Sequence, residues 1–258
     1  MGGRKSRCCA VMCAVLLAGC RIYFDPIVAE DGGIDADITA IDAMIDAPLL
    51  PATQVTFVDS AATTNNNTVY AFNGLSIGAP ATNRLIVVTV ASNSPTDIVS
   101  VVVGTVTATR AVMYPTVGPS GVSAIYYALV PLATTANVVV TLSTGASRCV
   151  VGLYRVLFES SPTPTAVTSA AGWTGSSSTD VARLGNGVGI WIGQRDNNNA
   201  AFALTLDGVT PPADASGTFS SANFYWQYGR TSPLTDGTST YAANFGANTG
   251  AVIAAYFR

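Results

Sequence analysis

The 258-residue sequence contains no histidine, and its one lysine, Lys5, lies within the first twenty residues. Nucleophilic sites that pair serine or cysteine with histidine, or serine with lysine, need a base that the chain beyond residue 20 does not contain. Zinc sites lose a common nitrogen ligand for the same reason. The sequence therefore excludes the familiar catalytic sites that depend on these bases.

Charge is also scarce, at 10% of residues. Residues 51–258 contain eight arginines and eight acidic residues, so this part of the chain is close to neutral and lacks the basic face that nucleic-acid binding needs. We expect no nucleic-acid partner. After residue 20, no apolar run approaches the roughly 18 to 20 residues of a membrane-spanning helix, which excludes a helical membrane bundle.

The first twenty residues differ in character from all that follow. Arg4, Lys5 and Arg7 form a basic start, and Cys8 to Ala18 form an apolar stretch of signal-peptide length. Small residues then precede Cys20. This order of basic, apolar and small residues predicts an export signal over residues 1–19.

The segment Leu17-Ala18-Gly19-Cys20 resembles the lipobox of bacterial lipoprotein precursors. The resemblance implies that Cys20 becomes the first mature residue and carries diacylglycerol on its thiol, so that membrane lipid is a partner. Each buried methylene contributes about 0.8 kcal/mol, so two or three acyl chains give a stable anchor. Arg21 stands where the family's inner-membrane retention signal has Asp, which favours the outer membrane. The alternative is an ordinary cleaved signal with an incidental cysteine.

Residues 20–50 are rich in Asp and Ala and are expected to form a largely disordered acidic tether that self-repulsion extends. Their composition is similar to spacers in surface lipoproteins of Gram-negative bacteria. Two alternatives are a short amphipathic helix and a calcium site. The helix is suggested by isoleucines at helical spacing, and the calcium site by three aspartates whose spacing does not match an EF-hand loop. Calcium therefore stays unsupported, and we expect no cofactor.

Residues 51–258 read as one all-β domain. Short β-branched runs alternate with Gly, Pro, Asn, Ser and Thr, and no window offers a convincing helix. This pattern predicts a two-sheet antiparallel β-sandwich or jelly roll, with a closed barrel as the alternative. The tandem of runs over about residues 84–158 resembles the jelly-roll or concanavalin-like modules of bacterial surface proteins. About twelve to fourteen strands are expected, and the predicted segments include 84–92, 97–104, 122–130, 137–143, 148–158, 187–195 and 251–258.

Five cysteines are present, and four of them lie in the first twenty residues. Cys149 is therefore the one cysteine of the β domain and cannot form an internal disulfide. It lies in the apolar run "SRCVVGLYRVLF", which predicts a buried side chain rather than a reactive thiol.

The densest aromatic stretch is "NFYWQYGR", residues 223–230. Strand alternation places Phe224, Trp226 and Tyr228 on one face and Tyr225 with Gln227 on the other. If Tyr225 or Trp226 is exposed, its ring beside Gln227 and Arg230 could stack on a sugar or on a partner's side chain. The alternative is that these rings are core and cross-strand pairs.

The loop "QRDNNNA" after a predicted strand offers further hydrogen-bonding groups, namely Arg195, Asp196 and Asn197. A ligand-binding loop is one interpretation. A solvated turn is the other, because the similar segment "TTNNNT" shows that this chain uses Asn-rich turns elsewhere. Trp173 is a third candidate aromatic residue.

Two functional classes stay open. The favoured hypothesis is a membrane-anchored surface lipoprotein whose β-sandwich binds or adheres to a glycan or an envelope protein and is not an enzyme. The alternative is a jelly-roll carbohydrate-active enzyme, which would need two converging carboxylates from Glu159 and the seven aspartates of the β domain. A purely structural envelope protein is a third interpretation.

Overall fold

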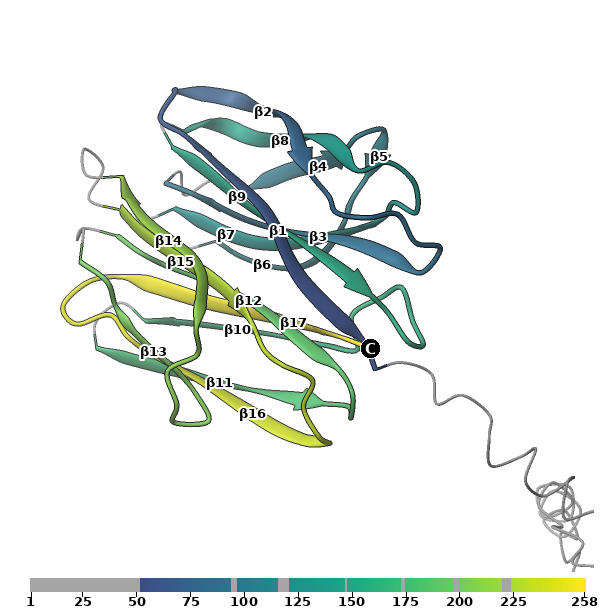
Figure 1. The fold of residues 1–258 in the computed structure, drawn as a ribbon. Helices are drawn as coiled ribbons and strands as arrows, with labels where there is room; N and C mark the ends of the chain where they lie inside the picture. The colour runs from purple at the N-terminus through teal and green to yellow at the C-terminus, as the bar shows by residue number, and fades with distance from the viewer. Residues whose placement is uncertain are drawn as a thin grey trace, which may run out of the picture. The chain divides into compact units, whose positions relative to one another are not determined.

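The β-branched runs form seventeen strands in the described part of the chain, where no α-helix is present (Figure 1). The computed structural model describes residues 52–93, 97–115, 121–146, 148–172, 175–196, 200–219 and 224–258. The strands pair antiparallel throughout these ranges. The all-β antiparallel prediction is therefore confirmed. The predictions for residues 1–50, including Cys20 and the acidic tether, lie outside the described residues.

The first nine strands form two sheets. Sheet A has the order β1 (Gln54–Thr63), β9 (Cys149–Leu157), β3 (Arg84–Ser92), β7 (Val122–Leu129), β6 (Thr109–Pro115). Sheet B has the order β2 (Asn67–Ser76), β8 (Thr135–Ala146), β4 (Ile98–Val103), β5 (Val106–Thr107). The chain crosses between the sheets from β1 to β4 and again from β7 to β9, which is the strand arrangement of a jelly roll.

The remaining eight strands form two more sheets. Sheet C has the order β10 (Ala166–Gly172), β17 (Gly250–Phe257), β12 (Val188–Arg195), β15 (Phe224–Arg230), β14 (Ala213–Phe219). Sheet D has the order β11 (Ser176–Arg183), β16 (Gly237–Asn244), β13 (Ala203–Leu206). The chain again alternates between the two sheets along most of its course.

The second half repeats the strand order of the first. In both halves the last strand lies between the first and third strands and pairs with both. The first residue of this last strand also has equivalent partners in the two halves. Cys149 lies opposite Thr63 and Ser92, and Gly250 lies opposite Gly172 and Arg195. The protein therefore contains two jelly-roll sandwiches of one topology, where the sequence analysis expects a single two-sheet sandwich.

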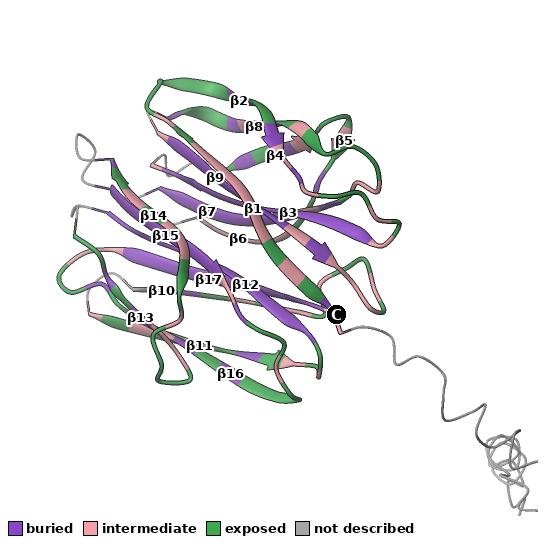
Figure 2. Ribbon diagram, in the orientation of Figure 1, coloured by how far each residue is buried: buried purple, intermediate pink, exposed green. Residues whose placement is uncertain are grey.

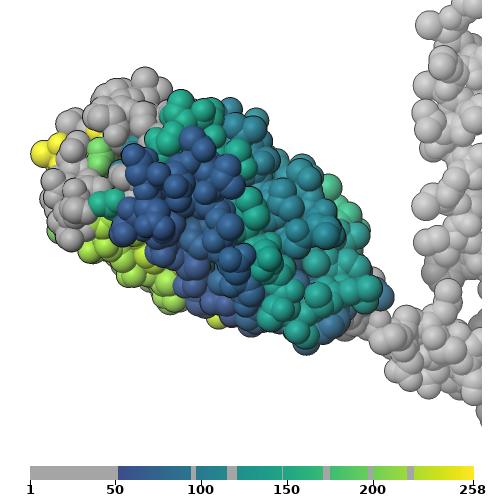
Figure 3. Space-filling model, turned by 90° about the horizontal axis from the view of Figure 1, so that it is seen from above, coloured from purple at the N-terminus to yellow at the C-terminus, as the bar shows by residue number. Residues whose placement is uncertain are grey.

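The four sheets stack in the order B, A, C, D (Figure 1). One cluster of buried side chains joins sheets A and B, a second joins A and C, and a third joins C and D. Seen from above, residues of the first half cover most of the visible face, and the second half appears at its margin (Figure 3). The large sheets A and C thus pack against each other and join the two sandwiches.

The central strands of sheets A and C are buried on both faces, as Figure 2 shows. Every residue of β3, β12 and β17 is buried, so these strands have no polar side and read as continuous apolar runs. In β8, of an outer sheet, Val138, Val140 and Leu142 are buried while Ser143 is exposed, which is the alternation of a strand with one face toward solvent. Cys149 is also buried, as its apolar run predicts, and burial raises the pKa of its thiol.

Candidate functional site

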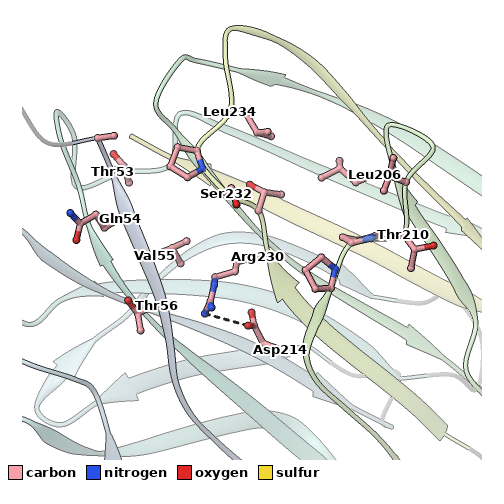
Figure 4. Close-up of a pocket in the computed structure, with 16 residues that line it drawn as sticks. Thr53, Gln54, Val55, Thr56, Leu206, Thr210, Asp214, Arg230, Ser232 and Leu234 are labelled. Carbon is pink, nitrogen blue, oxygen red and sulfur yellow. Dashed lines mark ion pairs between the residues drawn. The ribbon is translucent and has the colours of Figure 1, made fainter.

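A groove of about 860 Å³ lies beside the contact between the two sandwiches (Figure 4). One wall is the start of β1, in the first sandwich. The other wall comes from the loops around β14 and β15, in the second sandwich. The described residues that line it are 52–56, Leu206, 209–212, Asp214 and 230–234. Both halves of the chain are therefore needed to form the groove, whose size is typical of sites for small ligands.

An ion pair between Asp214 and Arg230 lies in the groove (Figure 4). Arg230 Nη1 is 3.3 Å from Asp214 Oδ1, and the two side chains are 35% and 15% exposed. Burial raises the pKa of the Asp214 carboxyl above its ordinary value of 3.8, whereas the Arg230 charge and the Tyr154 hydroxyl act to lower it. The pair gives the groove a polar centre with little net charge.

Local irregularity places Asp214 there. In the β14–β15 ladder, Ala213 lies opposite Gly229 and Ala215 opposite Tyr228, so Asp214 is the extra residue of a β-bulge. Bulges re-aim a side chain out of the regular strand alternation. Arg230 is the last residue of β15. Pro233 follows in the next loop and cannot continue the ladder, because proline has no backbone N–H. The bulge and the strand end together bring the two charged groups into contact.

Four packed aromatic rings lie behind the ion pair. The Phe57 ring centroid is 5.5 Å from that of Tyr154 and 6.0 Å from that of Tyr228, while Trp226 stacks on Tyr228 at 5.2 Å. Burial raises the pKa of Tyr228 to about 12 and raises that of Tyr154 as well, so both phenols stay protonated at neutral pH. Gly152 makes room for this cluster, because a Cβ there would lie 2.5 Å from the Tyr228 ring.

The structure places the two rings of the aromatic candidate site in the core. Tyr225 and Trp226 are each 8% exposed, since Trp226 packs between sheets A and C and Tyr225 between sheets C and D. Both faces of β15 are core, because a second sandwich covers the side that a single sandwich would leave to solvent. These two rings therefore form no exposed platform.

Three other predicted residues lie in or next to the β12–β15 ladder. Arg195 lies opposite Tyr225 in the β12–β15 ladder, and Arg195, Asp196 and Gln227 are all buried. The Arg195 Nη1 donates to the Ala201 carbonyl at 3.2 Å, and the Tyr225 hydroxyl donates to Gln227 Oε1 at 3.4 Å. Arg195 and Gln227 thus both lie next to Tyr225, and their polar groups form hydrogen bonds within the protein.

Arg230 is the one predicted binding residue that lines the groove among the described residues. It lies opposite Ile190, five positions along β15 from Tyr225, which corresponds to about 17 Å. The predicted set is therefore divided between two places. Asn197 and Trp173 lie outside the described residues. The sequence does not distinguish Asp214 from the other aspartates of the β domain, because its segment "PPADASG" contains no recognisable motif.

Three further observations concern carboxylates, metal-binding groups and membrane-spanning helices in the described part of the chain. Asp214 is the one carboxylate among the described residues lining the groove, so the paired acids of a glycosidase do not meet there. Within the described ranges, no group of three or more acidic or cysteine side chains is placed to bind a metal ion. None of the described residues belongs to a helix long and apolar enough to cross a membrane.

No protein-family model matches the chain, and searches of curated proteins and of solved structures find no significant match. The groove and its ion pair are therefore interpreted from their own chemistry.

Proposed function

We propose that this chain is an exported bacterial lipoprotein, anchored to the outer membrane through acylated Cys20. Its two jelly-roll sandwiches would be displayed at the cell surface on the acidic tether of residues 20–50. The lipobox-like segment Leu17-Ala18-Gly19-Cys20 supports the anchor, and the neutral, lysine-free β region supports a binding module rather than a nucleic-acid protein.

The groove with the Asp214–Arg230 pair is the observation that carries the binding function. A concave site of about 860 Å³ with a few convergent polar groups suits a ligand of modest size. The ion pair supplies a hydrogen-bond donor and an acceptor, and both are held by the strand framework. We therefore propose a binding or adhesion module for a glycan or an envelope protein, with Arg230 and Asp214 as its binding residues.

Metabolic labelling tests the anchor. The full chain is expressed in a Gram-negative host with radiolabelled palmitate, beside Cys20→Ser and the matched control Cys13→Ser. We expect label on the wild type and on Cys13→Ser, because Cys13 lies in the segment that would be removed. Cys20→Ser should remain unlabelled and unprocessed. Label that persists on Cys20→Ser, or that is missing from the wild type, rules the anchor out.

A further inference from the structure

β1 has a free edge at the groove. It is the terminal strand of sheet A, so one of its sides has no strand partner among the described residues. Five consecutive residues, 52–56, line the groove. Gln54, Val55 and Thr56 of this run belong to β1. Side chains of a strand alternate between the two sheet faces, so three consecutive strand residues line one groove when the strand presents its backbone edge. The groove therefore gives access to unpaired N–H and C=O groups of β1.

The two walls differ in their ability to form a backbone ladder. Pro211 and Pro212 lead into β14, the edge strand of sheet C, on the opposite wall. Proline has no N–H and is a common means of protecting a sheet edge from pairing. Gln54, Val55 and Thr56 include neither proline nor a charged residue. Residues 54–56 of the sheet A edge are thus open to pairing within the groove, and the bulge of β1 between Phe57 and Asp59 lies beyond them.

Arg230 supplies complementary charge in the same groove. Its guanidinium has five N–H donors, and among the described residues its one polar contact is the ion pair with Asp214. The remaining donors can bind the partial negative charge of peptide carbonyls. In contrast, none of the described residues lining the groove is aromatic, so a sugar ring has no stacking surface there.

We infer that the ligand is an extended peptide segment of a partner protein, which adds to sheet A as a strand along Gln54–Thr56. Main-chain hydrogen bonds with β1 would give affinity, as in other cases of strand addition, and Arg230 would bind a carbonyl of the segment. The groove has the volume of a small-ligand site, which suits a short segment rather than a folded copy of the chain. This inference rests on the proposed binding function.

The test uses the full lipidated chain in detergent on two arrays. One array presents peptides of about twelve residues with alternating apolar and polar side chains, and the other presents glycans. Wild type, Arg230→Ala and Arg258→Ala are compared. Arg258 is the matched control, since its pair with Glu159 has side-chain exposures of 37% and 14% and it does not line the groove. We expect peptide binding that Arg230→Ala weakens about tenfold or more and that Arg258→Ala leaves nearly unchanged.

Hydrogen exchange with the best peptide locates the contact. We expect slower exchange at backbone amides of residues 54–56 and no change in the edge strand β11 of sheet D. Binding without protection of β1 overturns strand addition. Glycan binding that depends on Arg230 overturns the peptide inference and leaves the proposed binding function in place. A wild-type chain that binds neither array overturns both.

Discussion

At the scale of single residues, Arg84 is a fully buried arginine held by carbonyls alone. Its Nε donates to Val130 O at 2.7 Å, its Nη1 to Ile77 O and Gly78 O at 3.3 and 2.8 Å, and its Nη2 to Leu132 O and Ala133 O at 2.6 and 2.9 Å. The planar fork thus joins the loop after β2 to the loop after β7. Arg84 is 0% exposed, so each of these hydrogen bonds is needed, because a buried charged donor left unpaired is costly.

We expect Arg84→Lys to destabilise the fold strongly. Lysine has three donors and no fixed fork, so at least two of the five hydrogen bonds to a charged group are lost, at about 1.5–3 kcal/mol each. Arg110→Lys is the control, since its ion pair with Asp97 is 49% and 57% exposed, and a surface pair contributes at most about 1 kcal/mol. Urea denaturation of both variants measures the difference. Equal losses would show that the Arg84 hydrogen bonds contribute little.

Asp214 should make folding stability depend on pH. An acid whose pKa is raised in the folded state holds its proton more tightly there, so stability falls as pH rises through the interval between the unfolded and folded pKa values. For Asp214 this interval starts at 3.8 and extends to the raised folded value. Its contribution is therefore most favourable below pH 3.8 and is lost above the folded pKa.

Asp214→Asn removes this titration. The melting temperature of the variant minus that of wild type should therefore become more positive between about pH 3.5 and pH 7. Ser232→Ala serves as control, because this groove residue has no titratable side chain and its difference should stay level over the same pH range. A difference that is flat for Asp214→Asn would contradict the assigned burial effect.

At the scale of elements, the sequence predicted the central strands well. "RLIVVTVAS" coincides with β3, and the run at 122–130 ends one residue beyond β7. These strands are apolar on both faces, so their runs stand out. Polar edge strands such as β11, "SSSTDVAR", were not predicted, because half-exposed strands of small polar residues resemble loops in composition.

Paired valine substitutions test whether sheet A is covered on both faces. On β3, neighbouring Val87 and Val88 are both fully buried, so Val→Thr at either should cost about 1–3 kcal/mol for an unpaired hydroxyl. On β8, Val140 is buried and Val139 is half-buried, so a comparable loss is expected at Val140 and a smaller one, within about 0.5 kcal/mol, at Val139. Chemical denaturation of the four variants measures this. A small loss at Val87 would mean that sheet C does not cover sheet A.

At the scale of the whole molecule, the sequence did not disclose the duplication. β9 reads "CVVGLYRVL" and its counterpart β17 reads "GAVIAAYF", so equivalent positions are mostly buried in both strands but share one residue, Val151 and Val252. Register is set by burial and pairing, which a search for repeated letters does not detect. The groove could not be predicted from the sequence either. Thr56 and Asp214 are more than 150 residues apart, and they line one groove only because sheet A packs on sheet C.

The packing of sheet A on sheet C predicts that neither sandwich is independent. A chain that ends at residue 165 keeps β1–β9 and loses sheet C, which exposes Leu85, Val87, Ile125 and the other sheet A side chains of the central cluster. An uncovered apolar face larger than several hundred Å² promotes association. We therefore expect the truncated chain to aggregate or to bind the dye ANS, whereas the full chain elutes as a defined species and binds little dye. A truncated chain that stays monomeric, excludes ANS and unfolds cooperatively would show that the first sandwich is stable alone. The central cluster would then be a contact between two autonomous domains, and the groove between them would be free to open.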